Sequence, residues 1–469
     1  MVLPYSSCQF GGVWGVQYEG LYTDRFTYHP GEMINVHCSL KSGARVPFMF
    51  VRIDVRPEEV PLWLWATPQD FGNPNPGPEG ALFPVSVSVP ADAFEPGVYK
   101  VSMPPEAMLP ENRLNVGNGF PSDNSVAFFV VTPAVAGSTS RILWVHDSLT
   151  GVAYGGFGDQ SIYPSANGSA RTVSYLRPGL DRAATWSHGN VAFLRGHGYE
   201  FEFADLVDLA FAPPGHLDAY DLVCFVGQFE YMPNEVMSHL AAFQAGGGNL
   251  FVASHEFGIF RVRLDPMVGS MTTYKWDDVK DDPYWNSGPF TQLPLVAGVG
   301  MRAPASPWET EIIGQTVWPA HRISIGEFVS FSVYNLDEAG WIVEGTGIGA
   351  GDAFPGAIAE YVSGLCVEYD GGQPRPILVD DMRLPEGLVI WGARPSSDGL
   401  DWRAVPGTPT WQWPPLAGGH GTATYQQRSS GAQVVTLPSP TMCEWTVGVG
   451  YPAYDRMLLN IFARLSVRA

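Results

Sequence analysis

The chain has 469 residues, of which 45% are apolar and only 16% are charged, and its formal net charge is −21. A chain of this length is too long for one hydrophobic core, so we expect two or three domains. The negative charge argues against nucleic acid or an anionic membrane surface as a partner, because both would repel it. With 53 Gly and 41 Pro, the composition favours turns and long loops over a helical bundle.

The five cysteines lie far apart and form no CxxC pair. This spacing argues against a disulfide framework or a structural zinc site, and it indicates a reducing compartment. The first residues lack the basic and apolar regions of a secretory signal, and no apolar run is long enough to cross a membrane. The expected localisation is therefore cytoplasmic.

Residues 1–135 are expected to form an antiparallel, immunoglobulin-like β-sandwich. Short alternating runs follow one another between turns, and the run at 34–40, for example, comes directly after a Pro-Gly turn. The Gly- and Pro-rich stretch 70–80 is a loop by composition. Residues 132–140 are expected to be a linker between two domains.

Residues 141–469 are expected to form an α/β domain with a doubly wound, mostly parallel sheet, similar to class I amidotransferases. The apolar run 220–227 is typical of a strand that is buried on both faces. A helix is predicted at 233–248 and the next strand at 249–254, and this alternation favours parallel strands with crossover helices. The C-terminal stretch 454–469 has the pattern of an amphipathic helix.

Polar side chains follow the ends of the predicted strands. In an open α/β sheet, ligands bind beyond the carboxyl ends of the strands, so these side chains are expected to converge on one edge. The long segment 271–290 could cover that edge as a lid. The polar pairs in question are His146-Asp147, Glu230-Tyr231 and His255-Glu256.

Hydrolysis by a nucleophilic serine or cysteine is not favoured. The sequence has no GxSxG motif, and Cys224 lies inside a predicted buried strand, where a thiol is usually inert. A phosphate-binding glycine loop is missing as well. Paired carboxylates remain open as an acid/base couple for glycoside hydrolysis, and the candidates are Glu230, Glu256, Glu309 and Glu311.

A metal site is the other chemistry that the residues leave open. Its candidate donors are oxygen and nitrogen atoms without a thiolate, a set that suits iron or another hard to borderline metal. A bound metal ion lowers the pKa of its water and polarises a carbonyl oxygen, as amide hydrolysis requires. Such residues near strand ends can equally be structural. The donors are Tyr231, His188, His255 and His146 with nearby carboxylates.

Five segments carry a resemblance in the order in which they occur. They are "RILWVHDSLTGVAYGGFGDQSIY", "TVSYLRPGL", "WSHGNVAFLRGHGYEFEFA", "DLVCFVGQFEYMP" and "NLFVASHEFGIFRVRLD". In this order they resemble the large subunit of N,N-dimethylformamidase and its relatives. The N-terminal "YTDRFTYHPGEMINVHCS" also resembles the sandwich domain of these enzymes. The resemblance covers most of 20–40 and 141–265 and implies a dimethylformamidase-like catalytic domain.

The resemblance implies one iron ion, held by two Tyr phenolates and one Glu carboxylate, in an enzyme that hydrolyses a small formamide. Tyr231 matches the Tyr of the strand-end motif, and "WETEIIGQTVW" places Glu309 at the carboxylate ligand, with Glu311 as its nearest rival. His188 stands where the family has the first Tyr. The implied metal ligands are therefore His188, Tyr231 and Glu309. Ferric or ferrous iron is expected, and zinc is the alternative.

The expected function is metal-dependent hydrolysis of the carbon–nitrogen bond of a small or apolar N-substituted amide. Glu256 or Glu444 would shuttle a proton, and His255 would ligate the metal or orient another group. A homo-oligomer is expected, with a small partner subunit as a possibility. Two alternatives stay open, namely a non-catalytic ligand-binding or scaffold protein of the same fold and a carboxylate-pair glycoside hydrolase.

Overall fold

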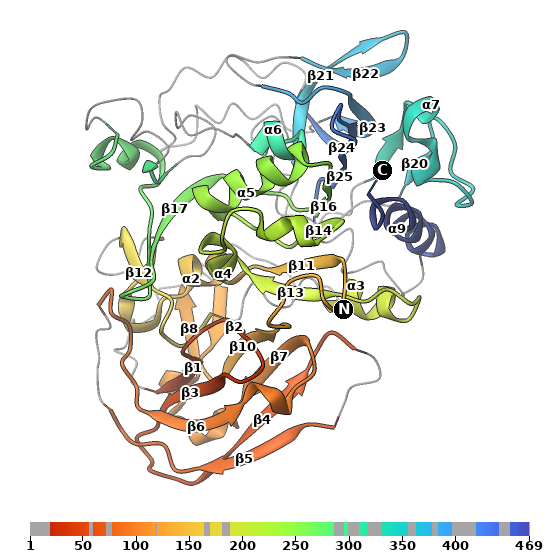
Figure 1. Ribbon diagram of the computed structural model, residues 1–469. Coiled ribbons are helices and arrows are strands. Elements are labelled where there is room, and N and C mark those ends of the chain that lie inside the picture. The colour runs from red at the N-terminus through yellow and green to blue at the C-terminus, as the bar shows by residue number, and fades with distance from the viewer. Residues whose placement is uncertain are drawn as a thin grey trace.

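The computed structural model shows a β-sheet unit formed by the first part of the chain beneath a larger unit built on one long mixed sheet (Figure 1). The structure describes residues 19–55, 60–71, 77–117, 120–163, 169–180, 188–285, 295–298, 309–316, 330–354, 363–377, 383–395, 419–439 and 451–468.

The N-terminal unit consists of two sheets that share one apolar core. One sheet has the strand order β1-β3-β6, and the other has the order β2-β10-β7-β4-β5. Alternate residues of β3, such as Ile34 and Val36, point into this core opposite Phe48 of β4 and Phe129 of β10. The strands are β1 Gly20–Thr23, β2 Thr27–Tyr28, β3 Met33–Ser39, β4 Val46–Arg52, β5 Leu62–Ala66, β6 Val85–Pro90, β7 Gly97–Ser102 and β10 Val126–Val131.

Short elements connect these strands. The hairpin β8–β9 precedes β10, and the helical turns lie between β6 and β8. Their boundaries are η1 Ala91–Ala93, η2 Pro105–Ala107, α1 Pro110–Arg113, β8 Leu114–Gly117 and β9 Phe120–Asp123.

The long sheet is half parallel and half antiparallel. Its first strands, in the order β13-β11-β14-β16-β25, run parallel to one another. From β25 onward, the neighbours β24, β23, β19 and β20 each pair antiparallel, and β21 with β22 extends from β24. The strands are β11 Ile142–His146, β13 Glu202–Asp205, β14 Leu222–Val226, β16 Asn249–Ala253, β19 Phe331–Val333, β20 Ala353–Phe354, β21 Gly364–Asp370, β22 Gln373–Pro376, β23 Leu388–Pro395, β24 Gly419–Gln427 and β25 Gln433–Leu437.

The prediction of a doubly wound, mostly parallel α/β domain is therefore wrong. Strand residues outnumber helical residues, and the sheets are mixed and antiparallel. The crossover pattern that predicts a parallel sheet runs from β11 to β16, and β25 adds one more parallel strand beside β16. The C-terminal strands instead join through hairpins such as β24–β25, whose strands pair antiparallel across the turn 428–432.

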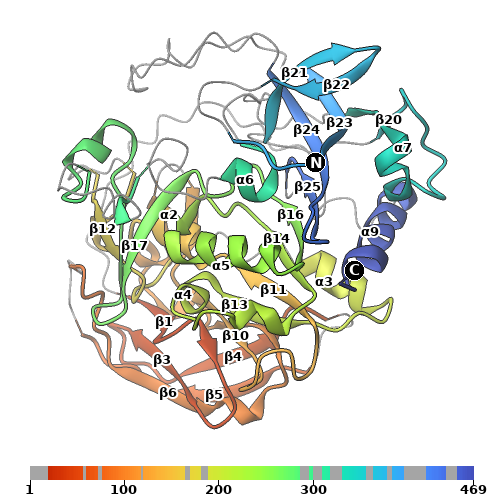
Figure 2. The ribbon, with the colours of Figure 1, turned by 45° about the horizontal axis from the view of Figure 1, so that its top comes forward.

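Helices cover both faces of the long sheet. On one face, α2, α4, α5 and α6 bury their apolar residues against β11, β14 and β16, and Figure 2 shows α6 beside α5. On the other face, α3 and α9 cover the same strands. The helices are α2 Ser148–Tyr154, α3 His188–Arg195, α4 Leu206–Ala210, α5 Asn234–Ala245, α6 Glu309–Ile313, α7 Leu336–Ala339 and α9 Pro452–Leu465, with the 3-10 turns η3 Phe157–Asp159, η4 His216–Ala219, η5 Trp276–Asp281 and η7 Gly340–Ile342.

The C-terminal helix α9 shows why an amphipathic sequence docks here. Its buried residues recur every three or four positions, so they form one stripe that faces the sheet. The Phe462 ring packs against the rings of Trp144 in β11, Phe201 directly before β13, and Phe251 in β16. The helix therefore closes the apolar face that α3 leaves open. Among the described residues, no helix has both the length and the apolar character needed to span a membrane.

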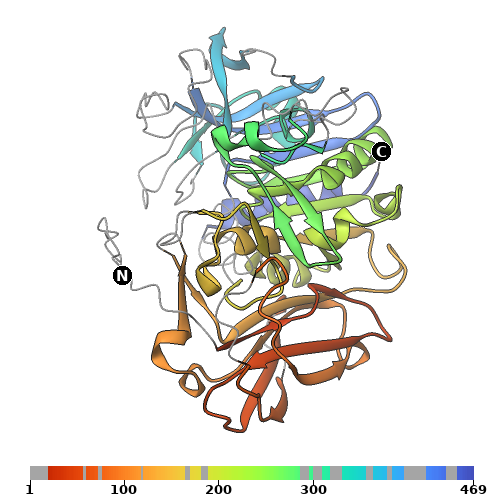
Figure 3. The same cartoon turned by 90° about the vertical axis from the view of Figure 1, so that its left-hand side faces the viewer.

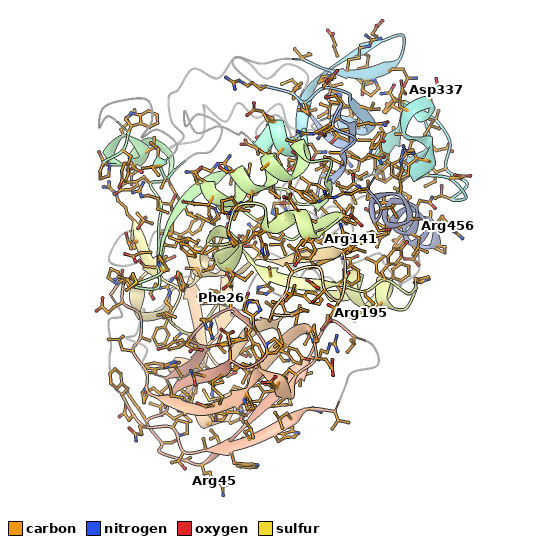
Figure 4. All side chains as sticks on the ribbon, in the orientation of Figure 1. Phe26, Arg45, Arg141, Arg195, Asp337 and Arg456 are labelled. Carbon is orange, nitrogen blue, oxygen red and sulfur yellow. The ribbon has the colours of Figure 1, made fainter. Side chains whose placement is uncertain are left out.

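The two units are joined by buried contacts. Arg195 of α3 forms an ion pair with Asp54 of the N-terminal unit, with 3.2 Å between Nε and Oδ2. Phe26 packs in the core of the larger unit and tilts against the ring of Tyr175. Figure 4 labels Phe26 and Arg195 at the junction, far from Arg45 at the outer end of the N-terminal unit, and Figure 3 shows the same layering from the side.

A small four-stranded sheet has the order β12-β18-β17-β15. In the chain, β12 lies between β11 and β13, β15 follows β14, and β17 and β18 follow β16. Residues 254–259 connect β16 to β17, and β18 leads into η5. This sheet positions the groups described below. Its strands are β12 Thr172–Ser174, β15 Tyr231–Pro233, β17 Phe260–Asp265 and β18 Ser270–Thr272.

A buried acid, lysine and tyrosine cluster as the candidate active site

The candidate site lies where three adjacent parallel strands end. Strands β11, β14 and β16 are neighbours in the sheet, so the residues that follow them meet at one edge, as the sequence predicts. The Asp147 carboxylate, which follows β11, accepts a hydrogen bond from the Phe229 backbone N–H at 2.7 Å. It also accepts one from the Thr150 N–H at the start of α2. Asp147 thereby fixes the chain that leaves β14.

The turn after β14 has a left-handed residue at its centre. Phe229 has a φ of 49°, a conformation that costs a non-glycine residue about 1 kcal/mol or more. Its buried ring packs against Phe225 and Phe257, which holds the turn in place. Gln228 and Glu230 lie on either side of this residue. The turn ends β14 abruptly and leads directly into β15.

Two buried carboxyl groups share one amide group. Gln228 Nε2 donates to Glu256 Oε2 at 2.6 Å and contacts Glu230 Oε2 at 3.3 Å. Glu230 is 2% exposed and Glu256 is 7% exposed. Two such groups cannot easily carry a negative charge at the same time. The Gln228 side chain therefore holds an acid pair in which the two members have different protonation preferences.

The surroundings of the two acids set these preferences. Burial, and next the Glu256 charge, raises the pKa of Glu230 to about 7. Burial also opposes ionisation of Glu256, but hydrogen bonds from His255 and Gln228 outweigh it and lower the pKa of Glu256. The His255 Nε2 atom lies 3.3 Å from Glu256 Oε2. Near neutral pH the pair therefore favours one proton, carried by Glu230.

Two tyrosines of the α2 region complete one side of the cluster. The Tyr163 hydroxyl donates to Glu230 Oε1 at 2.7 Å, and the Tyr154 hydroxyl accepts from Gln228 Nε2 at 3.4 Å. Their ring centroids lie 4.3 Å apart. Burial, and next the charge of Glu230, raises the pKa of Tyr163 well above its usual value. This phenol therefore keeps its proton as a hydrogen-bond donor.

Lys275 covers the other side. It comes from the segment 271–290, which the sequence predicts to be a lid, and its Nζ atom donates to the Tyr231 hydroxyl at 2.9 Å. The same atom lies 3.8 Å from Glu230 Oε1 and 3.5 Å from the ring centroid of Tyr163. Burial lowers the pKa of Lys275 to about 8. Only 13% of the lysine side chain is exposed, so Lys275 is a buried neighbour of the acid pair.

Tyr231, a predicted metal ligand, faces this cluster. Its ring stacks on Phe260, the residue that pairs with it across β15 and β17, with 5.4 Å between ring centroids. The next residues along the two strands, Met232 and Arg261, therefore point to the opposite face. The Tyr231 hydroxyl is bonded to Lys275, so the position next to the phenol oxygen already holds a positive charge.

Glu309, the predicted carboxylate ligand, lies on that opposite face. It is buried at the start of α6, accepts from Thr316 Oγ1 at 3.1 Å, and lies beside the charge of Arg261. Burial raises its pKa to about 7. Gly258 lies between Glu309 and Met232, the residue that points away from the Tyr231 face. A Cβ atom placed on Gly258 would be 3.8 Å from Met232 Cβ and 3.9 Å from Glu309 Cβ. Tyr231 and Glu309 therefore belong to two separate clusters.

The other predicted residues have different outcomes. The backbone of His188 begins α3, but its side chain is not among those that the structure describes, and Glu444 lies outside the described residues. Glu256 and His255 do lie in the cluster. His146 instead bonds to Asp205, with 2.9 Å between Nδ1 and Oδ2. Glu311, the rival of Glu309, is partly exposed and lies 3.5 Å from Arg383.

The metal that the resemblance implies does not fit this arrangement. Its two described ligands, Tyr231 and Glu309, are directed to opposite faces of the β15–β17 pair. Within the part of the chain that the structure describes, no group of three His, Cys, Asp or Glu side chains is arranged to hold a metal ion.

Sequence reasoning missed Gln228, Tyr163 and Lys275 as site residues. Tyr163 ends the first segment of the resemblance, and Lys275 is one of only four lysines in the chain, placed between two aromatic residues. These signals are weak, because the sequence around Tyr163 and around Lys275 does not indicate that the two residues, 112 positions apart, are in contact. That meeting follows from the pairing of β12, β18 and β17.

Comparison with known proteins gives one family. The family described as N,N-dimethylformamidase beta subunit-like, C-terminal, matches residues 84–455. None of the curated proteins compared with the chain matches it. The matched range includes Gln228, Glu230, Glu256 and Lys275, and it spans well over half of the 469 residues. This chain therefore belongs to the N,N-dimethylformamidase beta subunit-like, C-terminal family.

Proposed function

We propose that this protein hydrolyses the carbon–nitrogen bond of a small or apolar N-substituted amide, with Glu230 and Glu256 as its acid and base. The observation that carries the proposal is the pair of buried carboxyl groups held by one Gln228 amide. A pair with one protonated and one ionised carboxyl activates water against amides in aspartic proteases. The family to which the chain belongs is named after N,N-dimethylformamidase, an amide hydrolase, and this supports the same reaction class.

The reaction balances with the groups of this cluster. Glu256, the ionised member, removes a proton from water as its oxygen attacks the amide carbonyl carbon. Glu230, the protonated member, gives its proton to the leaving nitrogen as the carbon–nitrogen bond breaks. The products are a carboxylic acid and an amine. The acid then loses its proton to the amine or to solvent. The Glu pair still carries one proton, now on Glu256, and the return of this proton to Glu230 restores the starting state.

The phenols supply hydrogen bonds to this pair. The Tyr163 hydroxyl, whose high pKa keeps it protonated, donates to Glu230 Oε1, and this bond strengthens when Glu230 gives up its proton and becomes a carboxylate. His255 orients Glu256 from the other side. Because Glu256 and Lys275 are the most exposed of the charged groups in the cluster, a substrate would enter between them.

The family resemblance also implies a metal ion, iron or zinc, but Tyr231 and Glu309, the two implied ligands with described side chains, lie in separate clusters. No step of the proposed reaction passes through a metal. The family description names a beta subunit, so a partner subunit accompanies the proposal, together with a small-molecule amide as substrate.

The test is a substrate screen across formamides, acetamides and anilides, with free amine and free acid both measured. We expect equal amounts of amine and acid from wild type and from Glu235→Gln, whose exposed glutamate lies in the first turn of α5, and loss of both products in Glu256→Gln. If Glu256→Gln cleaves amides at the wild-type rate, the assignment of this cluster fails. Nitrophenyl glycosides belong in the same screen, because closely spaced carboxyls also serve retaining glycosidases.

A further inference from the structure

Lys275 is held in a cage of aromatic rings. Its Nζ atom lies 3.5 Å from the ring centroid of Tyr163, 4.3 Å from that of Phe260 and 5.5 Å from that of Tyr231. The Glu230 carboxyl, at 3.8 Å, completes the surroundings. Rings attract a cation over their faces, most strongly where water is excluded. The four side chains, which we call the ammonium cage, therefore form a binding site for a positively charged nitrogen.

The ammonium cage is more rigid than the lysine that fills it. Tyr231, Phe260 and Glu230 are each at most 2% exposed, and they sit on β15, β17 and the turn before β15. Lys275 lies between β18 and η5, outside both strands, and reaches the cage only through its side chain. Its direct polar contacts there are one hydrogen bond to Tyr231 and the ion pair with Glu230. The Lys275 side chain can therefore leave the cage without breaking any backbone hydrogen bond of the sheet.

The cage also lies next to the bond-breaking acid. Glu230 belongs to the cage and, under the proposed function, is the group that protonates the leaving nitrogen. Hydrolysis of an N-alkyl amide with one water gives one carboxylate and one alkylammonium ion, because amines keep a proton at neutral pH as a lysine side chain does. That ion forms against a carboxylate that has just become negative, between rings that favour alkylated cations.

We propose that the ammonium cage is the subsite for the amine half of the substrate, that it holds an alkylammonium ion such as dimethylammonium, and that Lys275 is an internal competitor that occupies it in the free protein. The choice of an amine as ligand rests on the proposed function, whereas the capacity to bind a small alkylammonium ion does not.

The test measures binding without turnover. Dimethylammonium chloride is titrated into the full chain by calorimetry, with sodium chloride at the same ionic strength as the reference. We compare wild type with Lys275→Met, which removes the competitor and keeps a flexible apolar chain. Lys280→Met is the matched control, because it changes an exposed lysine of the same segment. Glu230→Gln and Phe260→Leu are each tested in the Lys275→Met background, and circular dichroism with thermal melting confirms that every variant folds.

We expect Lys275→Met to bind dimethylammonium at least about tenfold more tightly than wild type, because a competing internal state reduces apparent affinity. Lys280→Met should equal wild type, and Glu230→Gln or Phe260→Leu should abolish the gain. Folded Lys275→Met protein that binds no more tightly than wild type would overturn the proposal, as would a gain that survives Glu230→Gln. If the variants bind dimethylammonium as expected but no amide is cleaved, the cage is supported and the proposed function is refuted. If amides are cleaved but the expected binding is not seen, the proposed function is supported and the cage is refuted.

Discussion

The side chains of Tyr231 and Glu309 lie on opposite faces of the strand pair β15–β17. Tyr231 stacks on Phe260 and bonds to Lys275, whereas Glu309 lies beside Arg261, the next residue along the same strand. Because neighbouring residues of a strand point to opposite faces, the two oxygen donors cannot meet at one ion while the strands keep this register.

The first prediction concerns this separation. Glu309→Gln should leave the metal content of the purified protein unchanged, as measured by elemental analysis. It should lower the free energy of unfolding by about 1 to 2 kcal/mol, because the buried Arg261 loses a neighbouring carboxyl that is partly ionised near pH 7. Denaturant unfolding gives the second quantity. A stoichiometric ion in wild type that is lost from both Glu309→Gln and Tyr231→Phe would show instead that the two residues share a metal.

The second prediction concerns the acid pair. Glu230→Gln and Glu256→Gln should each reduce kcat/KM for amide cleavage by about 100- to 10,000-fold, the usual loss when a general acid or base is removed. The double variant should be little worse than either single variant, because both act in one proton transfer sequence. Initial rates of amine release measure the effect. Independent losses that multiply in the double variant would argue against a coupled pair.

The third prediction follows from the protonation of that pair. The rate requires an ionised Glu256, whose pKa lies below its usual value, and a protonated Glu230, whose pKa is raised to about 7. The pH profile of kcat/KM should therefore be bell-shaped, and its alkaline limb should fall as Glu230 loses its proton near pH 7. Rates between pH 4 and pH 9, in a buffer series of constant ionic strength, give this profile. A rate that keeps rising above pH 8 would contradict the assignment of Glu230 as the acid.

The fourth prediction concerns the segment that joins the two units. The buried Glu202 carboxylate accepts hydrogen bonds from the N–H groups of Gly137 and Thr139, both at 2.8 Å, and from the Tyr220 hydroxyl at 2.8 Å. Burial alone would raise its pKa, but these bonds outweigh burial and lower it. Glu202→Gln should lower the free energy of unfolding at neutral pH by about 2 to 3 kcal/mol, since hydrogen bonds to a charged group are lost.

The sign of the pH effect at Glu202 follows from linkage. A carboxyl with a depressed folded-state pKa contributes stability that is complete above its unfolded pKa, near 4.5, and that is lost as pH falls through the folded value. The difference between wild type and Glu202→Gln should therefore shrink below about pH 4. Urea unfolding at several pH values measures it, with Glu200→Gln, at an exposed neighbouring position, as the control. A difference that stays constant down to pH 3 would contradict this account.

The fifth prediction concerns the C-terminal helix. Phe462→Ala in α9 removes a fully buried ring that packs against Trp144, Phe201 and Phe251. The cavity and the lost burial should cost about 3 to 5 kcal/mol, measured by denaturant unfolding. Val467→Ala, at a position that is 63% exposed, should cost little. Equal effects of the two substitutions would mean that α9 contributes no core to the protein.

Local patterns in the sequence were sufficient for two helices and one central strand. The helix predicted at 233–248 is α5, which spans Asn234–Ala245, and the amphipathic C-terminal stretch is α9. The apolar run at 220–227 is β14, whose five residues are all buried. In the two helices the hydrophobic period fixes which side faces the core, and in β14 the unbroken apolar run indicates burial on both faces. The resemblance likewise identified the family.

The tertiary structure decided the sheet and the site. The direction of β19 to β24 depends on which strand edge each one meets, and the short strands after Asp265 carry no period strong enough to show it. The edge formed by β11, β14 and β16 follows from strand order, but the faces of Tyr231 and Glu309 depend on the register of β15 with β17. Shifting that register by one residue would reverse both faces, and nothing local in the sequence sets it. For the same reason the contact of Lys275 with Glu230, between residues 45 positions apart, is visible only in the folded chain.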